Sequence, residues 1–255
     1  MTTTTLNVRS GTAVMVGREL RRTVRSIDGL VLSIVLPAMI LLSFVVIFGG
    51  AMNTGTEYVD YVVPAVIVLC AGYGAANTAV SVATDMTTGT IGRFRTLPTY
   101  GSAVLVGHVI TSVLRNLASS AVVVGVSFAL GFRPSGNVAG WLTAVGILLV
   151  FVVAMTWIAC LLGLLLSPEA ASGSTFLMIF LPYISSGFVP VNTLPEWIRG
   201  IAEHQPLTPV IEAVRSNLMG NTAYDDVWLA LAWWIPLGVA AHAGAAVLFQ
   251  RTRKR

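Results

Sequence analysis

Long apolar runs without a charged side chain alternate with short polar stretches along this 255-residue chain. Most of these runs reach or exceed the roughly 20 residues that an α-helix needs to cross a hydrocarbon core about 30 Å thick. The runs are continuously apolar, whereas strands of a membrane barrel alternate in polarity, so they predict helices and an all-α fold. The charge-free runs cover residues 29–56, 61–84, 116–132, 134–168, 170–195 and 227–250.

Six membrane-spanning helices are predicted, and together they make residues 1–255 one transmembrane domain. The third span is interrupted by His108 and Arg115, so one long helix is expected to start in the cytoplasm and enter the bilayer near Arg115. Arg115 is then expected to snorkel to the interface, with true burial as the alternative. The predicted spans are residues 29–50, 61–83, 102–131, 138–166, 171–188 and 227–249.

Residues 11–27 have the pattern of an amphipathic helix, with an apolar arc opposite an arginine-rich arc. This pattern predicts a helix that lies at the membrane interface with its arginines toward anionic lipid, and a solvated orienting segment is the alternative. The apolar arc contains Ala13, Val16, Leu20, Val24 and Ile27, and the opposite arc contains Arg18, Arg21, Arg22 and Arg25.

Residues 190–220 predict a helical hairpin rather than a simple loop. The sequence Thr-Leu-Pro-Glu at 193–196 has a capping-box pattern that would start one short helix. Thr208 followed by Pro209 resembles the start of a second helix, which would stop at Gly220. Such a hairpin is expected to dip part-way into the outer leaflet. In the preceding part of the chain, small residues at 71–76 predict close approach of another helix to the second span.

Composition excludes a water-soluble globule, because 55% of the residues are hydrophobic, only 10% are charged, and the mean hydropathy is +0.82. The isoelectric point is near 9.4, but the basic residues gather at span ends, which indicates topology rather than nucleic-acid binding. Cys70 and Cys160 lie within apolar runs, so neither a disulfide nor a metal site is expected.

The distribution of Lys and Arg predicts that both termini and the segment 84–98 are cytoplasmic. Three basic residues would lie outside: Arg133, Arg199 and Arg215. Those on the cytoplasmic side would be Arg9, Arg18, Arg21, Arg22, Arg25, Arg93, Arg95, Arg251, Arg253, Lys254 and Arg255.

Two motifs carry a resemblance to a known family. TDMTTGTIGRFRTLP, residues 84–98, looks like the acidic-x-x-x-Gly-Thr coupling segment of the permease subunit of ABC transporter type-2 exporters. GFVPVNTLPEWIRGIAEHQPLTPVIEAVRSNLMG, residues 187–220, looks like the outer signature of the same family. The chain is most similar to the daunorubicin-resistance-type drug and lipid exporters. One departure is Asp85, which stands where the family more often has Glu.

The resemblance implies ATP-driven export across the bacterial cytoplasmic membrane by a pair of permeases with a pair of ABC ATPase subunits. The second permease would be another copy of this chain or a related one, and ATP and Mg would bind the ATPase. The sequence agrees with an ATPase on a separate subunit. A phosphate-binding P-loop needs a Lys after its second Gly, and the only Lys here is Lys254 in the tail. This chain is therefore expected to bind no cofactor and to be no enzyme itself.

The resemblance also assigns candidate residues. Asp85 would favour a helix N-terminus, Gly89 would permit close packing against the ATPase, and the arginines would pair with its acidic groups. An ordinary cytoplasmic loop is the alternative. The candidate coupling residues are Asp85, Gly89, Thr90, Arg93, Arg95 and Pro98, with Arg18 and Arg22 as a second contact.

The conduit, by analogy, lies between two permeases. Its candidate residues are Phe44, Phe48, Tyr73, Phe180 and Tyr183, and packing against lipid or the protein core is the alternative for each of them. None of them is charged, which favours an amphiphilic drug, lipid or secondary metabolite as cargo. The residues that mark the outer hairpin are Pro190, Pro195, Trp197, Pro206 and Arg215.

Two other classes of function are alternatives to an exporter. An intramembrane serine protease would use Ser186 with His242, but Ile184 stands where its motif needs Gly, and no residue supplies an oxyanion hole. His242 is instead expected to pack between helices. A passive channel or carrier would differ from an exporter by transporting without an ATPase.

Overall fold

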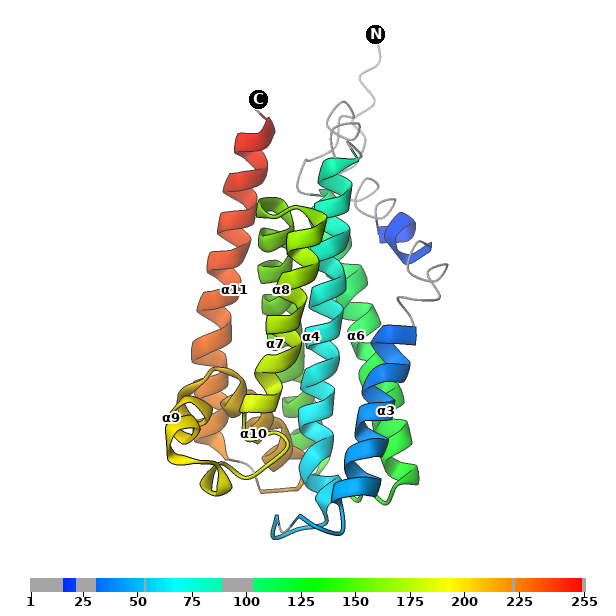
Figure 1. Cartoon of the computed structure of the whole chain (residues 1–255), viewed down its shortest axis with the longest axis vertical. Coiled ribbons are helices and arrows are strands. Elements are labelled where there is room, and N and C mark those ends of the chain that lie inside the picture. The colour runs from blue at the N-terminus through cyan, green and yellow to red at the C-terminus, as the bar shows by residue number, and fades with distance from the viewer. Residues whose placement is uncertain (1–15, 22–30, 53, 89–102, 222, 254–255) are drawn as a thin grey trace.

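The computed structural model describes residues 16–21, 31–52, 54–88, 103–221 and 223–253, and these residues form helices and connecting loops without any strand. The long helices run side by side along the longest axis of the molecule (Figure 1). This arrangement confirms the predicted all-α fold.

Four helices are long and apolar enough to cross a membrane. They are α4 (Tyr58–Thr87), α6 (Ala103–Ala129), α7 (Val138–Leu165) and α11 (Tyr224–Arg253). Each has 27 to 30 residues, which at 1.5 Å per residue gives about 40 Å or more and exceeds the thickness of the hydrocarbon core. They correspond to the second, third, fourth and sixth predicted spans.

Two shorter elements lie where the first and fifth spans were predicted. The first combines η1 (Val31–Val35), α3 (Leu36–Ser43) and η2 (Phe44–Phe48), in which η1 and η2 are turns of π-helix. The second combines α8 (Pro168–Phe180) with the 3₁₀ turn η3 (Leu181–Ile184). Both pack against α4. Whether these two also cross the membrane, which would make six spans, stays a prediction.

Helix α4 lies at the centre of the bundle, and every residue from Tyr61 to Gly72 on it is buried. Its small residues allow the close approach that the sequence predicted. A Cβ atom at Gly72 would lie 2.9 Å from the carbonyl oxygen of Met178 in α8. At Gly74 it would lie 2.3 Å from the side chain of Asn116 in α6. The prediction of close packing is therefore confirmed on two sides of α4.

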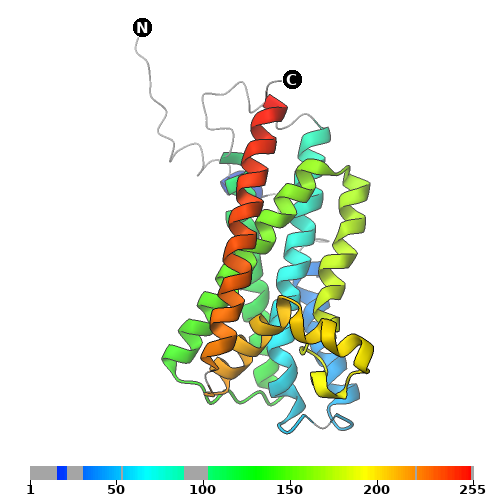
Figure 2. The ribbon, with the colours of Figure 1, turned by 90° about the vertical axis from the view of Figure 1, so that its left-hand side faces the viewer.

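The predicted hairpin consists of η4 (Val191–Thr193), α9 (Glu196–His204) and α10 (Leu207–Leu218). Both views place it at the end of the bundle opposite the C-terminal ends of α4 and α11 (Figures 1 and 2). In keeping with the predicted topology, we call the end of the bundle with the hairpin the outer end, and the opposite end the inner end.

The caps of the hairpin helices differ from the prediction. Helix α9 is preceded by Pro195, and the hydroxyl of Thr193 donates to the carbonyl oxygen of Pro190 instead of capping the helix. Thr208 lies inside the first turn of α10 and donates to the carbonyl oxygen of Ala202. The predicted capping roles of both threonines are wrong, because each hydroxyl satisfies a nearby loop or helix carbonyl.

Candidate functional site

A group of buried ionisable side chains lies at the inner end, where the segment joining α4 to α6 begins and ends. Glu19 comes from the helical segment 16–21, Asp85 from the last turn of α4, and His108 from the start of α6. The exposed fractions of these residues are only 5%, 3% and 4%. With Arg18 they form what we call the carboxylate–histidine cluster.

The imidazole of His108 lies between the two carboxylates. Its Nε2 atom is 3.2 Å from Oδ2 of Asp85, and its Nδ1 atom is 3.6 Å from Oε2 of Glu19. Arg18 contacts both acids, with Nη2 3.6 Å from Oδ2 of Asp85 and Nη1 3.5 Å from Oε1 of Glu19. Buried carboxylates are stable only when they are paired, so these contacts hold the three segments together.

The position of Asp85 corrects one sequence-based argument. Helix α4 continues to Thr87, so Asp85 lies near its C-terminal end and not near a helix N-terminus. The helix dipole disfavours a carboxylate there, and Arg18 and His108 offset this cost. Of the other candidate coupling residues, Gly89, Thr90, Arg93, Arg95, Pro98 and Arg22 lie outside the described residues.

Glu19, Asp85 and His108 offer ligand atoms that all lie within 4.8 Å of one another, as a divalent metal site would require. However, the two carboxylates face different nitrogens of the same imidazole, and one ion binds only one of those nitrogens. Arg18 also lies against both acids. The arrangement therefore suits an ion-pair network better than a metal centre.

A buried polar face continues from His108 along α6 toward the middle of the bundle. Its residues lie three or four apart, which puts them on one side of the helix. Ser112 accepts a hydrogen bond of 3.2 Å from Thr156 of α7. The buried polar residues of this face are Thr111, Ser112, Asn116 and Ser119, and the half-buried Arg115 lies among them.

Arg115 turns inward instead of snorkelling, so that prediction is wrong. Its Nη2 atom donates to the carbonyl oxygen of Gly74 at 2.8 Å and to the hydroxyl of Thr78 at 3.3 Å. The small residues of α4 leave this carbonyl within reach, so the guanidinium binds inside the bundle and does not extend to the interface. The alternative reading of the sequence, a buried arginine, is the one that the structure supports.

Four of the five candidate conduit residues form one aromatic cluster near the outer end. The ring of Phe44 lies 5.3 Å from that of Phe48 and 6.5 Å from that of Tyr183, and Tyr183 lies 6.0 Å from Phe180. The cluster is open on one side, because Phe48 and Phe180 are 41% and 57% exposed. In the described chain, the half-buried Tyr73 has no ring contact with these four.

The residue at the centre of this aromatic cluster was not predicted from the sequence. Phe188 is only 2% exposed, and its ring stacks on Tyr183 at 4.7 Å and lies 4.7 Å from Phe44. It belongs to the loop that follows η3. Its position within the Gly-Phe-Val-Pro start of the outer motif was the available signal.

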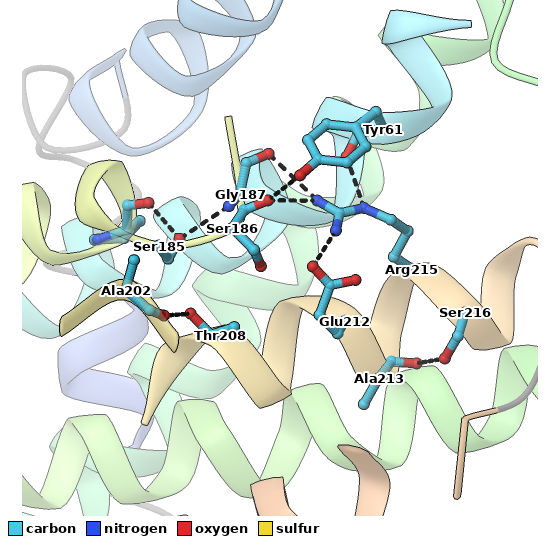
Figure 3. A network of polar contacts seen from close by, with 11 residues as sticks. Tyr61, Ser185, Ser186, Gly187, Ala202, Thr208, Glu212, Ala213, Arg215 and Ser216 are labelled. Carbon is cyan, nitrogen blue, oxygen red and sulfur yellow. Dashed lines mark hydrogen bonds and ion pairs between the residues drawn. The ribbon is translucent and has the colours of Figure 1, made fainter. Parts of the chain in front are cut away.

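The loop that carries Phe188 is held by a polar network centred on Arg215 of α10 (Figure 3). Arg215 donates to the carbonyl oxygens of Tyr61 at 3.1 Å, Ser186 at 3.0 Å and Gly187 at 3.4 Å. Its guanidinium also lies 3.7 Å from the centre of the Tyr61 ring and pairs with Glu212. A cation that satisfies three carbonyls in this way fixes the loop against α4 and α10.

Two tyrosines of α4 complete the support of this loop. The hydroxyl of Tyr61 donates to the carbonyl oxygen of Ser186 at 2.6 Å, and that of Tyr58 donates to Phe188 at 3.0 Å. Neither tyrosine was singled out from the sequence. The start of α4, the outer hairpin and the aromatic cluster are thus one connected unit.

The other hairpin candidates mark the starts of its elements. Pro190, Pro195 and Pro206 directly precede η4, α9 and α10. The carbonyl oxygen of Pro206 accepts a hydrogen bond of 2.9 Å from Trp234 of α11. Trp197 is 76% exposed on α9.

The structure gives Ser186 and His242 separate surroundings. The hydroxyl of Ser186 is buried with no hydrogen-bond partner, while its carbonyl is held by Tyr61 and Arg215. His242 packs edge-on against Trp157 of α7, with ring centres 4.3 Å apart. No described contact joins the serine to this histidine, so the two do not form a nucleophile–base pair.

Comparison with known proteins gives consistent matches. Residues 11–219 match the family model described as ABC-2 type transporter. The chain is 34% identical over 201 residues to the daunorubicin resistance ABC transporter permease protein DrrB1 of Streptomyces coeruleorubidus, covering 78% of this chain and 71% of that protein. It is 24% identical over 245 residues to the probable doxorubicin resistance ABC transporter permease protein DrrC of Mycobacterium tuberculosis, covering 94% and 88%.

Proposed function

Because the chain belongs to the ABC-2 type transporter family, we propose that it is the membrane-spanning permease of an ATP-driven exporter. The family membership confirms the resemblance found in residues 84–98 and 187–220. The proposal goes further in three respects: a separate chain hydrolyses ATP, the permease lies in the bacterial cytoplasmic membrane, and both termini face the cytoplasm. The charge distribution supports this orientation.

The proposed assembly has two permeases and two ABC ATPase subunits, with membrane lipid around them. The second permease is another copy of this chain or a related one. Two observations support an ATPase on another chain: the relatives are named as permease proteins of ABC transporters, and Lys254 is the only lysine in the sequence. Without a suitably placed lysine, the chain has no P-loop.

The contacts within the carboxylate–histidine cluster are the main support for the proposed coupling mechanism. Asp85 and His108 lie on either side of residues 89–102, the segment between α4 and α6, and they contact each other. Glu19 and Arg18 attach the N-terminal helical segment to the same point. An ATPase that displaces this connecting segment would therefore move α4, α6 and the N-terminal helix together.

This geometry changes the role that we propose for Asp85 and Arg18. With 3% exposure, Asp85 has little surface to offer an ATPase, and Arg18 lies against it. Both act in our proposal as internal anchors that transmit the movement. Direct contact with the ATPase is assigned to Gly89, Thr90, Arg93, Arg95 and Pro98, with Arg22 on the N-terminal segment.

Movement of α4 would reach the proposed conduit through Tyr58 and Tyr61. These two residues hold the loop that carries Phe188, which in turn packs on Phe44 and Tyr183. Aromatic side chains without charge suit a flat amphiphile. The relatives' names refer to resistance to daunorubicin and doxorubicin, which supports a drug-like cargo, with a lipid or secondary metabolite also in this class.

Reconstitution tests this function. Proteoliposomes that contain the chain and an ABC ATPase encoded beside it should accumulate or release daunorubicin only when ATP is present. As a control, a Lys→Ala substitution in the P-loop of the ATPase should abolish transport. Transport by the permease alone, at the same rate, would instead establish a passive channel or carrier.

A further inference from the structure

A groove on the outside of the bundle lies between α7 and α11, and the mechanism above does not use it. Its volume is about 520 Å³, which is within the roughly 300–1,000 Å³ typical of small-molecule sites. Its walls include Val153 and Trp157 from α7 and Val239 and His242 from α11. The lining is apolar apart from the ring nitrogens of His242 and the indole N–H groups.

The floor of the groove is formed by two small residues. A Cβ atom at Gly238 would lie 3.0 Å from Cβ of Ala154, so the two helices approach closely there. Larger side chains on either side then stand above this floor. Val153 and Val239 are 37% and 63% exposed and border the opening. The groove is therefore a consequence of how the two helices cross.

His242 has an unusual environment for a membrane helix. It is exposed on α11, its ring centre lies 4.3 Å from that of Trp157, and it forms no hydrogen bond within the described chain. It precedes Arg253 by eleven residues, which is about 16 Å along a helix. His242 lies fifteen and eight residues from the two ends of the charge-free run 227–250, which places it well inside a core about 30 Å thick.

At that depth, lipid offers only hydrocarbon to an imidazole that has one donor and one acceptor. Leaving such a group without a hydrogen bond in an apolar medium is costly. An acyl chain could fill the groove, but it could not satisfy the ring nitrogens. A ligand that carries a hydrogen-bonding group would both fill the space and pair with His242.

We infer that this α7–α11 groove is a membrane-facing binding site for a planar aromatic amphiphile with hydroxyl or carbonyl groups. The aromatic rings would pack against Trp157, and a polar group would face His242. This inference rests on the proposed function, because it places a cargo-class molecule at a site reached from the lipid. It is separate from the aromatic cluster at Phe44, Tyr183 and Phe188.

Ligand binding can be measured without any ATPase, on the chain in lipid nanodiscs. The probes are 1,4-dihydroxyanthraquinone, which has hydroxyl and carbonyl groups, and anthracene, which has neither. Quenching of Trp157 fluorescence is taken as the difference between the native chain and Trp157→Phe. Saturable quenching is expected for both probes. His242→Phe should weaken 1,4-dihydroxyanthraquinone about tenfold and leave anthracene unchanged, because only the hydrogen bond is lost.

A matched pair of substitutions on α11 separates the groove from the general lipid surface. Val239→Phe fills the opening and should reduce quenching by both probes at least about fivefold, whereas Val247→Phe, 50% exposed outside the groove, should not. Equal effects of the two substitutions, or quenching that never saturates, would mean that the probes merely dissolve in lipid and would overturn the inference.

The outcome for this site is distinguishable from that of the proposed function. Absence of saturable binding in the native chain, together with intact ATP-dependent export, would reject only the groove. Normal groove binding in a chain that exports nothing with its ATPase would reject the exporter and leave the groove as a binding site.

Discussion

Nε2 of His108 lies 3.2 Å from Oδ2 of Asp85, which joins the start of α6 to the end of α4. Both residues are buried, and Glu19 and Arg18 bring the N-terminal helical segment to the same point. These contacts attach the N-terminal helical segment to α4 and α6, which also pack directly against each other. In our proposal, this unit transmits the movement that the ATPase imposes on the segment between α4 and α6.

Substitution of Asp85 should leave the buried His108 and Arg18 with Glu19 as their remaining carboxylate. For Asp85→Ala we expect a loss of roughly 3–5 kcal/mol in the free energy of unfolding, since breaking a buried ion pair has this cost. Thermal unfolding in detergent measures it, with the exposed Glu57→Ala as a control. The double variant with His108→Ala should lose less than the sum of the single variants. Additive losses would mean that the two residues do not interact.

Arg115 should resist replacement by an apolar residue of similar length. Arg115→Met removes the hydrogen bonds to Gly74 and Thr78, so we expect destabilisation by about 1–3 kcal/mol. The neighbouring Leu114→Met, at a 48% exposed position, should be nearly neutral. If the unfolding curves of the two variants coincide, Arg115 does not form stabilising hydrogen bonds with α4.

Gly74→Ala tests the close contact between α4 and α6. Its Cβ would lie 2.3 Å from the Asn116 side chain, so we expect overpacking that costs about 1–3 kcal/mol. The same substitution at Gly125 of α6 meets nothing within 4 Å and should be neutral or stabilising by up to about 1 kcal/mol. Thermal unfolding of both variants gives the comparison, and a stable Gly74→Ala protein would argue against this packing.

The outer network can be weakened without any change of charge. Tyr61→Phe removes only the hydroxyl that donates to Ser186, which should cost about 1 kcal/mol and lower export by loosening the loop at Phe188. Tyr224→Phe removes a hydroxyl from a 71% exposed residue and should leave export at the native level. Export by both variants is measured in the reconstituted system. Equal export by the two would show that the loop at Phe188 does not affect transport.

Much of the architecture could be predicted from the sequence, because a chain in lipid must form helices from its continuous apolar runs. The hairpin helices α9 and α10 followed from short amphipathic segments between prolines. Their caps did not, since the hydroxyls of Thr193 and Thr208 had carbonyl partners that only the folded loop supplies.

The polar sites were less accessible to sequence reasoning, because each depends on contacts between distant segments. Glu19 stood among arginines in a pattern typical of a solvated face, yet it is buried, while Leu20 on the apolar arc is 38% exposed. The direction of Arg115 depends on the carbonyl oxygen of Gly74, which only the packing of α6 against α4 brings within reach. Asp85 belongs to α4 because that helix continues past the end of the charge-free run, which length alone did not predict.

In our proposal, an ATPase moves residues 84–98. Gly89→Trp tests it most directly, in proteoliposomes that contain the ABC ATPase. ATP hydrolysis and daunorubicin export are measured together, with Thr56→Trp in the exposed loop at the outer end as the control. We predict that Gly89→Trp reduces export to background while the ATPase still hydrolyses ATP and the permease inserts normally. Export at the native rate by the Gly89→Trp protein would contradict the account.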